Sequence, residues 1–114
     1  MRTDIVKTDV AERIIKVMAD RIVKKFNPEK VILFGSFARG TAGPDSDADF
    51  LVIMPVQGTR RDAAIEIDVC LSGMGLAKDV FVAPPDDVAR YGSCPGTLTA
   101  TALAEGKTVY ERAA

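Results

Sequence analysis

The 114-residue sequence predicts an α+β fold in which a small β-sheet is flanked by helices. Three short runs rich in β-branched and aromatic residues, at 31–34, 50–53 and 78–83, are bounded by Gly, Pro or Asp, as buried strands commonly are. Around these runs, apolar residues recur at steps of three and four, which is the pattern of helices that bury one face. Hydrophobic residues make up 47% of the chain, enough for one compact core.

The first predicted helix precedes the strand at 31–34. Thr8 or Asp9 can cap its start. The side chains expected to face inward recur at helical spacing and are Val10, Ile14, Val17, Met18, Ile22 and Phe26. Asn27-Pro28 ends the helix, because proline disfavours helical backbone at the residue before it. We expect this helix to lie against the sheet.

A second helix is predicted at 59–71, after the strand at 50–53. The residues expected on its inward face are Ala63, Ala64, Ile67, Cys70 and Leu71. Glycines at 73 and 75 close this helix. The alternating strand at 78–83 then ends at two prolines, which cannot extend it.

Two shorter helices and a terminal strand complete the predicted fold. The first helix runs from Pro85 through Tyr91, with two aspartates in its first turn, where the helix dipole favours acids. The second covers 97–105 and is expected to end at Gly106 in the left-handed conformation that favours glycine. Residues 108–110 form a short strand or an extended tail. No repeat or linker interrupts residues 1–114, so we expect a single domain.

Composition excludes several classes of function. The 15 Lys and Arg nearly balance the 16 Asp and Glu, so no global positive field marks a nucleic-acid or membrane-surface protein. The absence of His excludes a His-based triad and a zinc-water hydrolase. Cys70 and Cys94 do not form a disulfide framework. The sequence lacks a signal peptide or membrane span, so we expect a cytoplasmic protein with no membrane partner.

The loop between the first two strands carries most of the candidate chemistry. It opens with Gly35-Ser36, and after ten further residues Asp47 and Asp49 lead into the next strand. Strand residues two apart project to the same face, so both carboxylates should point one way. A third acid, Asp79, begins another strand. Unpaired acids at strand ends cost desolvation, so these three favour a cation supplied from outside.

Three other interpretations of this loop fit less well. The spacing of Gly35 and Gly40 is that of a phosphate-binding P-loop, but the lysine that should follow is Thr41. The dinucleotide fingerprint fails because position 37 is not glycine. A calcium loop starting at Asp45 would need a glutamate where Val56 stands. Ordinary turn chemistry explains each motif singly but not their combination.

Gly35-Ser36, ten residues, Asp47-Ala-Asp49 and the later Asp79 together resemble the signature of the polymerase-β-like nucleotidyltransferase superfamily. The chain is most similar to its minimal, stand-alone (MNT-type) members, some of which are antitoxins that transfer AMP to a HEPN-domain toxin. This resemblance implies a small mixed sheet flanked by helices. It also implies Mg²⁺-dependent transfer of a nucleotide, AMP from ATP, to a hydroxyl acceptor on a partner protein such as a HEPN-type toxin.

The resemblance also implies roles for the three acids. Asp47 and Asp49 would hold metal ions and the triphosphate, while Asp79 would complete the metal site and act as general base. Two Mg²⁺ ions about 3.5–4 Å apart can activate a hydroxyl and neutralise a leaving pyrophosphate. Asp68, on the predicted second helix, is the rival third acid and is ranked below Asp79.

The nucleotide-binding residues implied by the motif are Gly35, Ser36 and Arg39. Glycine lets the backbone approach a phosphate closely, and the amide and hydroxyl of Ser36 would contact the terminal phosphates. Arg39 is the nearest cation, although a solvated surface role is the alternative. Phe37 and Tyr91 are candidates for stacking on a base or meeting a partner.

Two other functions stay open at this point. A small molecule of the aminoglycoside type could be the acceptor in place of a protein. The chain could also be a non-catalytic nucleotide-binding or interaction module, because catalysis depends on geometry that sequence does not show. The choice of ATP over other nucleotides and the oligomeric state are likewise not determined by these residues.

Overall fold

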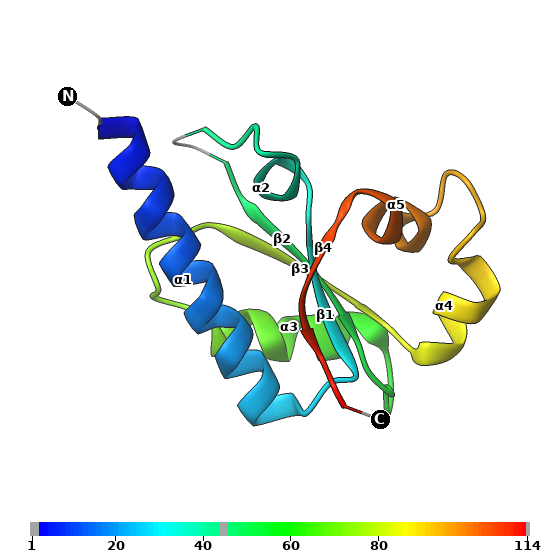
Figure 1. The fold of residues 1–114 in the computed structure, drawn as a ribbon. Coiled ribbons are helices and arrows are strands. Elements are labelled where there is room, and N and C mark those ends of the chain that lie inside the picture. Colours follow the sequence, from blue (N-terminus) through cyan, green and yellow to red (C-terminus); the bar gives the residue numbers. More distant parts are fainter. Residues whose placement is uncertain (1–2, 44–45, 114) are drawn as a thin grey trace.

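The computed structural model describes residues 3–43 and 46–113. A four-stranded sheet in the order β3-β2-β1-β4 forms its centre, and helices lie on both of its faces (Figure 1). The strands are β1 (Lys30–Phe34), β2 (Ala48–Ile53), β3 (Lys78–Ala83) and β4 (Lys107–Glu111). The helices are α1 (Thr3–Phe26), α2 (Ser36–Arg39), α3 (Arg60–Cys70), α4 (Pro85–Tyr91) and α5 (Leu98–Glu105).

The sheet is mixed, as the resemblance implied. β1 pairs antiparallel with both β2 and β4, whereas β2 pairs parallel with β3 through the crossover that contains α3. In this register Phe34 at the end of β1 lies opposite Asp49 near the start of β2, and Asp49 lies beside Asp79 near the start of β3. The end of one strand and the starts of two others therefore meet at one edge of the sheet.

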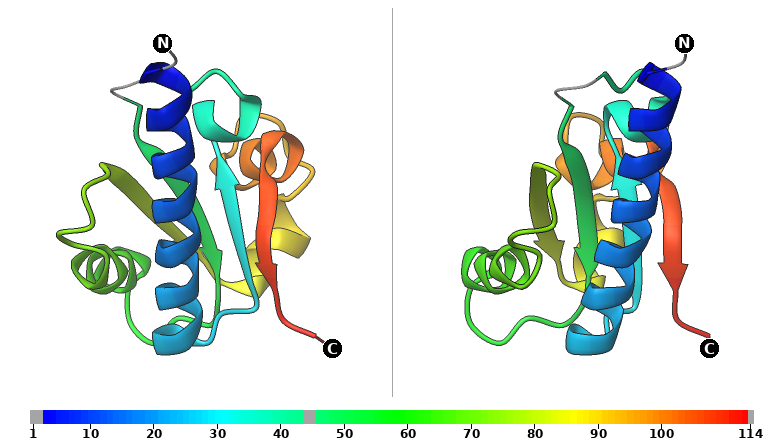
Figure 2. Two further views of the ribbon diagram at one scale, coloured as in Figure 1. Left: turned by 60° about the vertical axis from the view of Figure 1, so that its left-hand side comes forward. Right: turned by 90° about the vertical axis from the view of Figure 1, so that its left-hand side faces the viewer.

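Each face of the sheet has its own hydrophobic core. α1 and α3 cover one face, and α4 and α5 cover the other (Figure 2). Alternation along β1 sends Val31 and Leu33 into the first core and Ile32 and Phe34 into the second. The largest fully buried side chain, Phe50, belongs to the first core. Burying a side chain of this kind contributes about 1.5–3 kcal/mol.

Helix α1 begins earlier than the sequence analysis predicted. It starts at Thr3 and not at a cap formed by Thr8 or Asp9. No glycine or proline between these positions interrupts a helix, so threonine and aspartate here lie inside the first turns. The end agrees with the prediction: Asn27 takes a φ of 49°, its amide donates to the Val23 carbonyl, and the buried Pro28 follows.

The buried face of α1 agrees with the prediction only in part. Val10 and Val17, expected to face inward, are 47% and 48% exposed. The residues that α1 buries are Ala11, Ile15, Met18, Ala19 and Ile22. Met18 and Ile22 are buried as predicted, and Ile14 and Phe26 pack against the first core. Two alanines on the buried face allow the helix to lie close to the sheet, which a count of large apolar residues overlooks.

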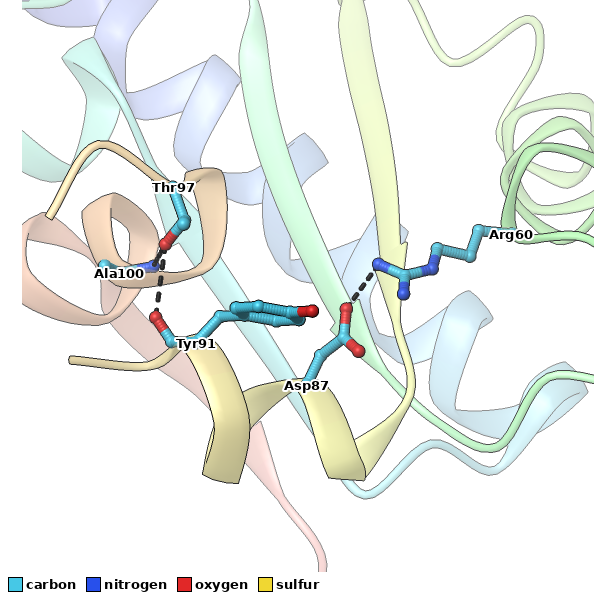
Figure 3. Close-up of polar contacts among 5 residues, drawn as sticks. All are labelled: Arg60, Asp87, Tyr91, Thr97 and Ala100. Carbon is cyan, nitrogen blue, oxygen red and sulfur yellow. Dashed lines mark hydrogen bonds and ion pairs between the residues drawn. The ribbon is translucent and has the colours of Figure 1, made fainter. Parts of the chain in front are cut away.

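The predictions for α3, β3 and α4 are confirmed. Thr59 caps α3 by accepting a hydrogen bond from the Asp62 amide at 3.0 Å, and Ile67 and Leu71 are buried beneath the helix. β3 occupies 78–83, as expected. α4 begins at a proline and buries Asp87, whose carboxylate forms an ion pair with Arg60 at the start of α3 (Figure 3).

Helix α5 ends differently from the prediction. Thr97 caps its start by accepting from the Ala100 amide at 3.1 Å, and its hydroxyl donates to the Tyr91 carbonyl (Figure 3). At the other end, Gly106 is not left-handed but extended, with φ −81° and ψ 167°. A side chain at this position would collide with the Ile32 side chain and the Ala102 carbonyl. Glycine is therefore needed for close packing of α5 on β1.

No helix in the described ranges is long and apolar enough to cross a membrane.

Candidate active site

The strand ends that meet at one edge of the sheet form the floor of a cleft of about 460 Å³. Every residue that the motif singled out lines it: Gly35, Ser36, Arg39, Asp47, Asp49 and Asp79. Phe34, Thr101 and Glu105 complete the lining. The structure thus gathers residues from β1, α2, β2, β3 and α5 around one space.

The three aspartates differ in exposure. Asp47, just before β2, and Asp79, on the edge strand β3, are exposed, while Asp49 is partly buried between them. The pairing of β2 with β3 places Asp49 and Asp79 at the same level of the sheet. Strand alternation turns Ala48 and Phe50 to the opposite side, where both are buried. The acids therefore face the cleft because their neighbours fill the core.

This crowding of acids perturbs Asp49. Burial raises the pKa of Asp49 above its ordinary value, and the negative charges of Asp79 and Asp47 raise it further. A hydrogen bond between the Asp49 and Asp79 carboxyl groups, which needs one of them protonated, acts in the same direction. The positive charge of Arg39 partly offsets these effects. A cation placed among the three acids would relieve their repulsion.

Gly35 is required by both its conformation and its surroundings. Its φ of 78° and ψ of −153° lie in a region that residues with a side chain rarely adopt. A Cβ atom there would also collide with the Asp49 carboxylate. The chain turns at Gly35 from β1 into the four-residue helix α2, which begins at Ser36. Gly35 therefore allows Asp49 to approach the turn that carries Ser36.

Arg39 is the cation of the cleft, and it is not simply solvated. Its Nη1 donates to Oε1 of Glu105, the last residue of α5, at 3.1 Å. The two side chains are 51% and 42% exposed. Sequence analysis missed Glu105 and Thr101 because α5 comes after the last residue of the motif and carries no recognisable pattern of its own. The one available signal was an acid at a helix C-terminus, where the dipole disfavours it.

The remaining candidates lie away from the cleft. Asp68 is on α3, as expected, and its Oδ1 lies 3.3 Å from Nζ of Lys78. Phe37 packs against the core beneath α1 and α3, and Tyr91 is on α4. Neither aromatic ring lines the cleft. Asp45, considered for a calcium loop, falls outside the described residues.

The aspartates of the cleft fit a Mg²⁺ ion only if a substrate supplies further oxygen ligands. Within residues 3–43 and 46–113, no group of three or more His, Cys, Asp or Glu side chains is arranged to hold a metal ion. Mg²⁺, however, is commonly bound through one or two carboxylates together with substrate phosphates and waters. Asp49 and Asp79, side by side with Asp47 nearby, supply carboxylates of this kind. The cleft therefore suits a metal that arrives with a phosphate ligand.

Comparison with known families identifies the class of protein. Residues 15–94 match the family described as the nucleotidyltransferase domain. This match covers most of the chain, and the chain belongs to that family. The resemblance to polymerase-β-like nucleotidyltransferases is thus confirmed. The comparison with curated proteins found no match.

Solved structures confirm the fold. A protein from Sulfolobus solfataricus, provisionally assigned as a nucleotidyltransferase, superimposes with a TM-score of 0.68 at 19% identity, over 95% of this chain and 86% of that one. A chain from a toxin–antitoxin complex with AMP-PNP gives a TM-score of 0.53 at 20% identity, over 85% and 73% of the two chains. At these identities the likeness establishes a shared architecture.

Proposed function

We propose that this chain is a Mg²⁺-dependent nucleotidyltransferase that moves AMP from ATP to a hydroxyl group on a partner protein, acting as the antitoxin of a toxin–antitoxin pair. The observation that carries the proposal is the meeting of the whole motif, Gly35-Ser36 with Asp47, Asp49 and Asp79, in one cleft. Membership of the nucleotidyltransferase family supports the reaction class. The similarity to a chain of a toxin–antitoxin complex with AMP-PNP supports both the nucleotide and the partner.

Gly35, Ser36 and the three aspartates of the cleft each have a defined part in this mechanism. Asp47 and Asp49, with Asp79 completing the site, would hold two Mg²⁺ ions, which when bound would neutralise the triphosphate and the leaving pyrophosphate. The backbone at Gly35 approaches the terminal phosphates, and the Ser36 hydroxyl donates a hydrogen bond to them. Asp79 takes the proton of the acceptor hydroxyl as that oxygen attacks the α-phosphate. A carboxyl group binds metal in its ionised form, so the raised pKa of Asp49 makes metal binding depend on pH.

The position of Asp79 supports a large acceptor. β3 is an edge strand, and Asp79 is exposed on it. An attacking hydroxyl can therefore reach this carboxylate from outside the molecule. In contrast, the nucleotide-binding residues Gly35, Ser36 and Arg39 follow the central strand β1, at the N-cap of α2 and within α2. This arrangement supports an acceptor carried by a separate protein.

The proposal is tested with ATP labelled at either the α- or the γ-phosphate, incubated with the protein, Mg²⁺ and a lysate of its source cells. We expect label from α-labelled ATP alone to appear on a protein band. Asp47→Asn and Asp49→Asn should abolish transfer, since each removes a ligand charge without disturbing the core. The matched control is Asp68→Asn, an acid outside the cleft, which should transfer at the wild-type rate.

Three results would contradict the proposal. Transfer of the γ-label would define a kinase. Wild-type turnover in Asp47→Asn or Asp49→Asn would show that the metal assignment is wrong. ATP binding with no transfer of either label would instead favour a non-catalytic nucleotide-binding module.

A further inference from the structure

An ion pair between two helices closes one side of the cleft. Arg39 ends α2 and Glu105 ends α5, and the two side chains meet at 3.1 Å between Nη1 and Oε1. Both residues line the same cleft as the three aspartates. Glu105 is therefore a fourth carboxylate of the site, contributed by an element outside the motif.

The fold holds Glu105 at this place. The next residue, Gly106, packs so closely on β1 that a Cβ atom would collide with Ile32 and lie 3.0 Å from the Leu33 carbonyl oxygen. The end of α5 is thus fixed against the strand that leads directly to Gly35. Glu105 consequently cannot leave the neighbourhood of the cleft without moving the helix.

The electrostatic surroundings of Glu105 are unfavourable without Arg39. A carboxylate at a helix C-terminus adds to the negative end of the helix dipole. The cleft already contains Asp47, Asp49 and Asp79. Arg39 is the cation among the residues that line it, and its charge also lowers the pKa of Asp49. The positive charge of Arg39 therefore offsets the negative charge of Glu105 and also that of the aspartates in the cleft.

The contact itself is suited to being exchanged. A single nitrogen of Arg39 meets a single oxygen of Glu105, and about half of each side chain is exposed to water. An exposed pair of this geometry is weak, and a guanidinium binds phosphate oxygens as well as carboxylates. A triphosphate entering the cleft would bring a higher negative charge to the same arginine.

We infer that Glu105 is a positioning residue that holds Arg39 at the side of the cleft and competes with the triphosphate for it, so that Arg39 passes from Glu105 to a phosphate when ATP binds. This inference rests on the proposed function for the identity of the nucleotide. In this role Glu105 keeps the arginine in place before ATP arrives and lowers the affinity for polyphosphate. Removing its charge should therefore strengthen binding, and it should do so through Arg39.

The test is a double-mutant cycle, with dissociation constants measured by calorimetry for ATP and for inorganic tripolyphosphate, both with Mg²⁺. Glu105→Gln should bind both probes about two- to five-fold more tightly than the wild type, the range expected for an exposed ion pair. Arg39→Gln should bind more weakly. In the Arg39→Gln background, Glu105→Gln should have little further effect, which would show that the two residues act together.

The matched control is Glu111→Gln. Glu111 also forms an exposed ion pair, with Lys30 at 3.5 Å, but lies at the opposite end of β1 from the cleft. Its substitution removes the same charge and should leave both dissociation constants unchanged.

Equal or weaker binding by Glu105→Gln would overturn the inference while leaving the proposed transfer intact, provided the wild type binds ATP. Equal tightening in the presence and absence of Arg39 would also overturn it, because a general charge effect would then suffice. Failure of every variant to bind either probe would overturn both proposals. Tightening through Arg39 without any transfer of labelled AMP would support the inference and contradict the proposed function alone.

Discussion

At the scale of single residues, the cleft brings together negatively charged aspartates whose repulsion Arg39 offsets only in part. The pKa of Asp49 is raised from its ordinary value of 3.8, mainly by burial and then by Asp79 and Asp47. The folded protein therefore binds this proton more tightly than the unfolded chain does. The stabilisation of the fold by this proton is complete at pH values below the pKa of Asp49 in the unfolded chain. It is lost as the pH rises through the raised pKa of the folded state. At neutral pH the ionised Asp49 opposes folding of the metal-free protein.

Asp49→Asn should accordingly raise the melting temperature of the metal-free protein at neutral pH, since it removes the repulsion without changing the packing. The gain should shrink towards about pH 4, where the wild-type carboxyl group is increasingly protonated. Thermal melts in a chelator across this pH range measure both effects. Asp68→Asn, which loses the contact with Lys78 and relieves no crowding, should show no such gain. Identical melting of Asp49→Asn and the wild type at pH 7 would argue against repulsion within the cleft.

Gly35 shows how a backbone position serves the site. Gly35→Ala would place a methyl group against the Asp49 carboxylate in a strained conformation. We expect a loss of stability of about 1–3 kcal/mol and a loss of ATP binding. Urea denaturation measures the loss of stability, and calorimetry measures the loss of ATP binding.

Gly40→Ala is the matched control for Gly35→Ala. Gly40 has almost the same φ, 76°, but nothing lies within 4 Å of a Cβ atom built there. This variant should cost only the strain of the left-handed conformation, about 1 kcal/mol, and should still bind ATP. Similar losses in the two variants would show that the collision with Asp49 contributes little.

At the scale of elements, the join between α5 and β4 determines where Glu105 and Thr101 lie. Gly106→Ala should destabilise the protein by about 1–3 kcal/mol, because the added methyl group overpacks the contact with β1 while the backbone conformation suits any residue. It should also weaken the effect of Glu105 on ATP binding. Urea denaturation tests the first expectation, and calorimetry tests the second.

Gly43→Ala provides the comparison for Gly106→Ala. Position 43 has open space around it and no positive φ. Alanine there should be neutral or slightly stabilising. If Gly106→Ala were equally neutral, α5 would have to be free to shift on the sheet, and the fixed position of Glu105 would not hold.

At the scale of the whole molecule, the sheet separates two cores and exposes its chemistry at one edge. β4 is an outer strand, and its register shifts between Val31 and Ile32 of β1, a bulge that discourages pairing with other chains. β3, the other outer strand, carries Asp79 at the cleft. The two edges therefore differ: one is irregular, and the other takes part in the candidate site.

The sequence predicted most of the fold because its signals are local. Strand runs, prolines and turn residues depend on neighbouring residues, so the predicted bounds of β3 and α4 are confirmed. The predicted start of α1 was wrong, and so was the inward orientation of Val10 and Val17. In that helix, apolar residues occupy two adjacent stripes, and only contact with the sheet selects the stripe that contains Ala11 and Ala19.

The same division holds for the candidate site. The spacing of Gly35-Ser36, Asp47 and Asp49 by itself determined the family and the residues of the cleft that one loop contributes. The tertiary structure alone decided that Asp49 is crowded enough for its pKa to rise, that Gly106 serves packing and not a left-handed turn, and that Glu105 meets Arg39. These features depend on how a distant helix packs against the sheet, and such contacts leave no periodic or local pattern in the chain.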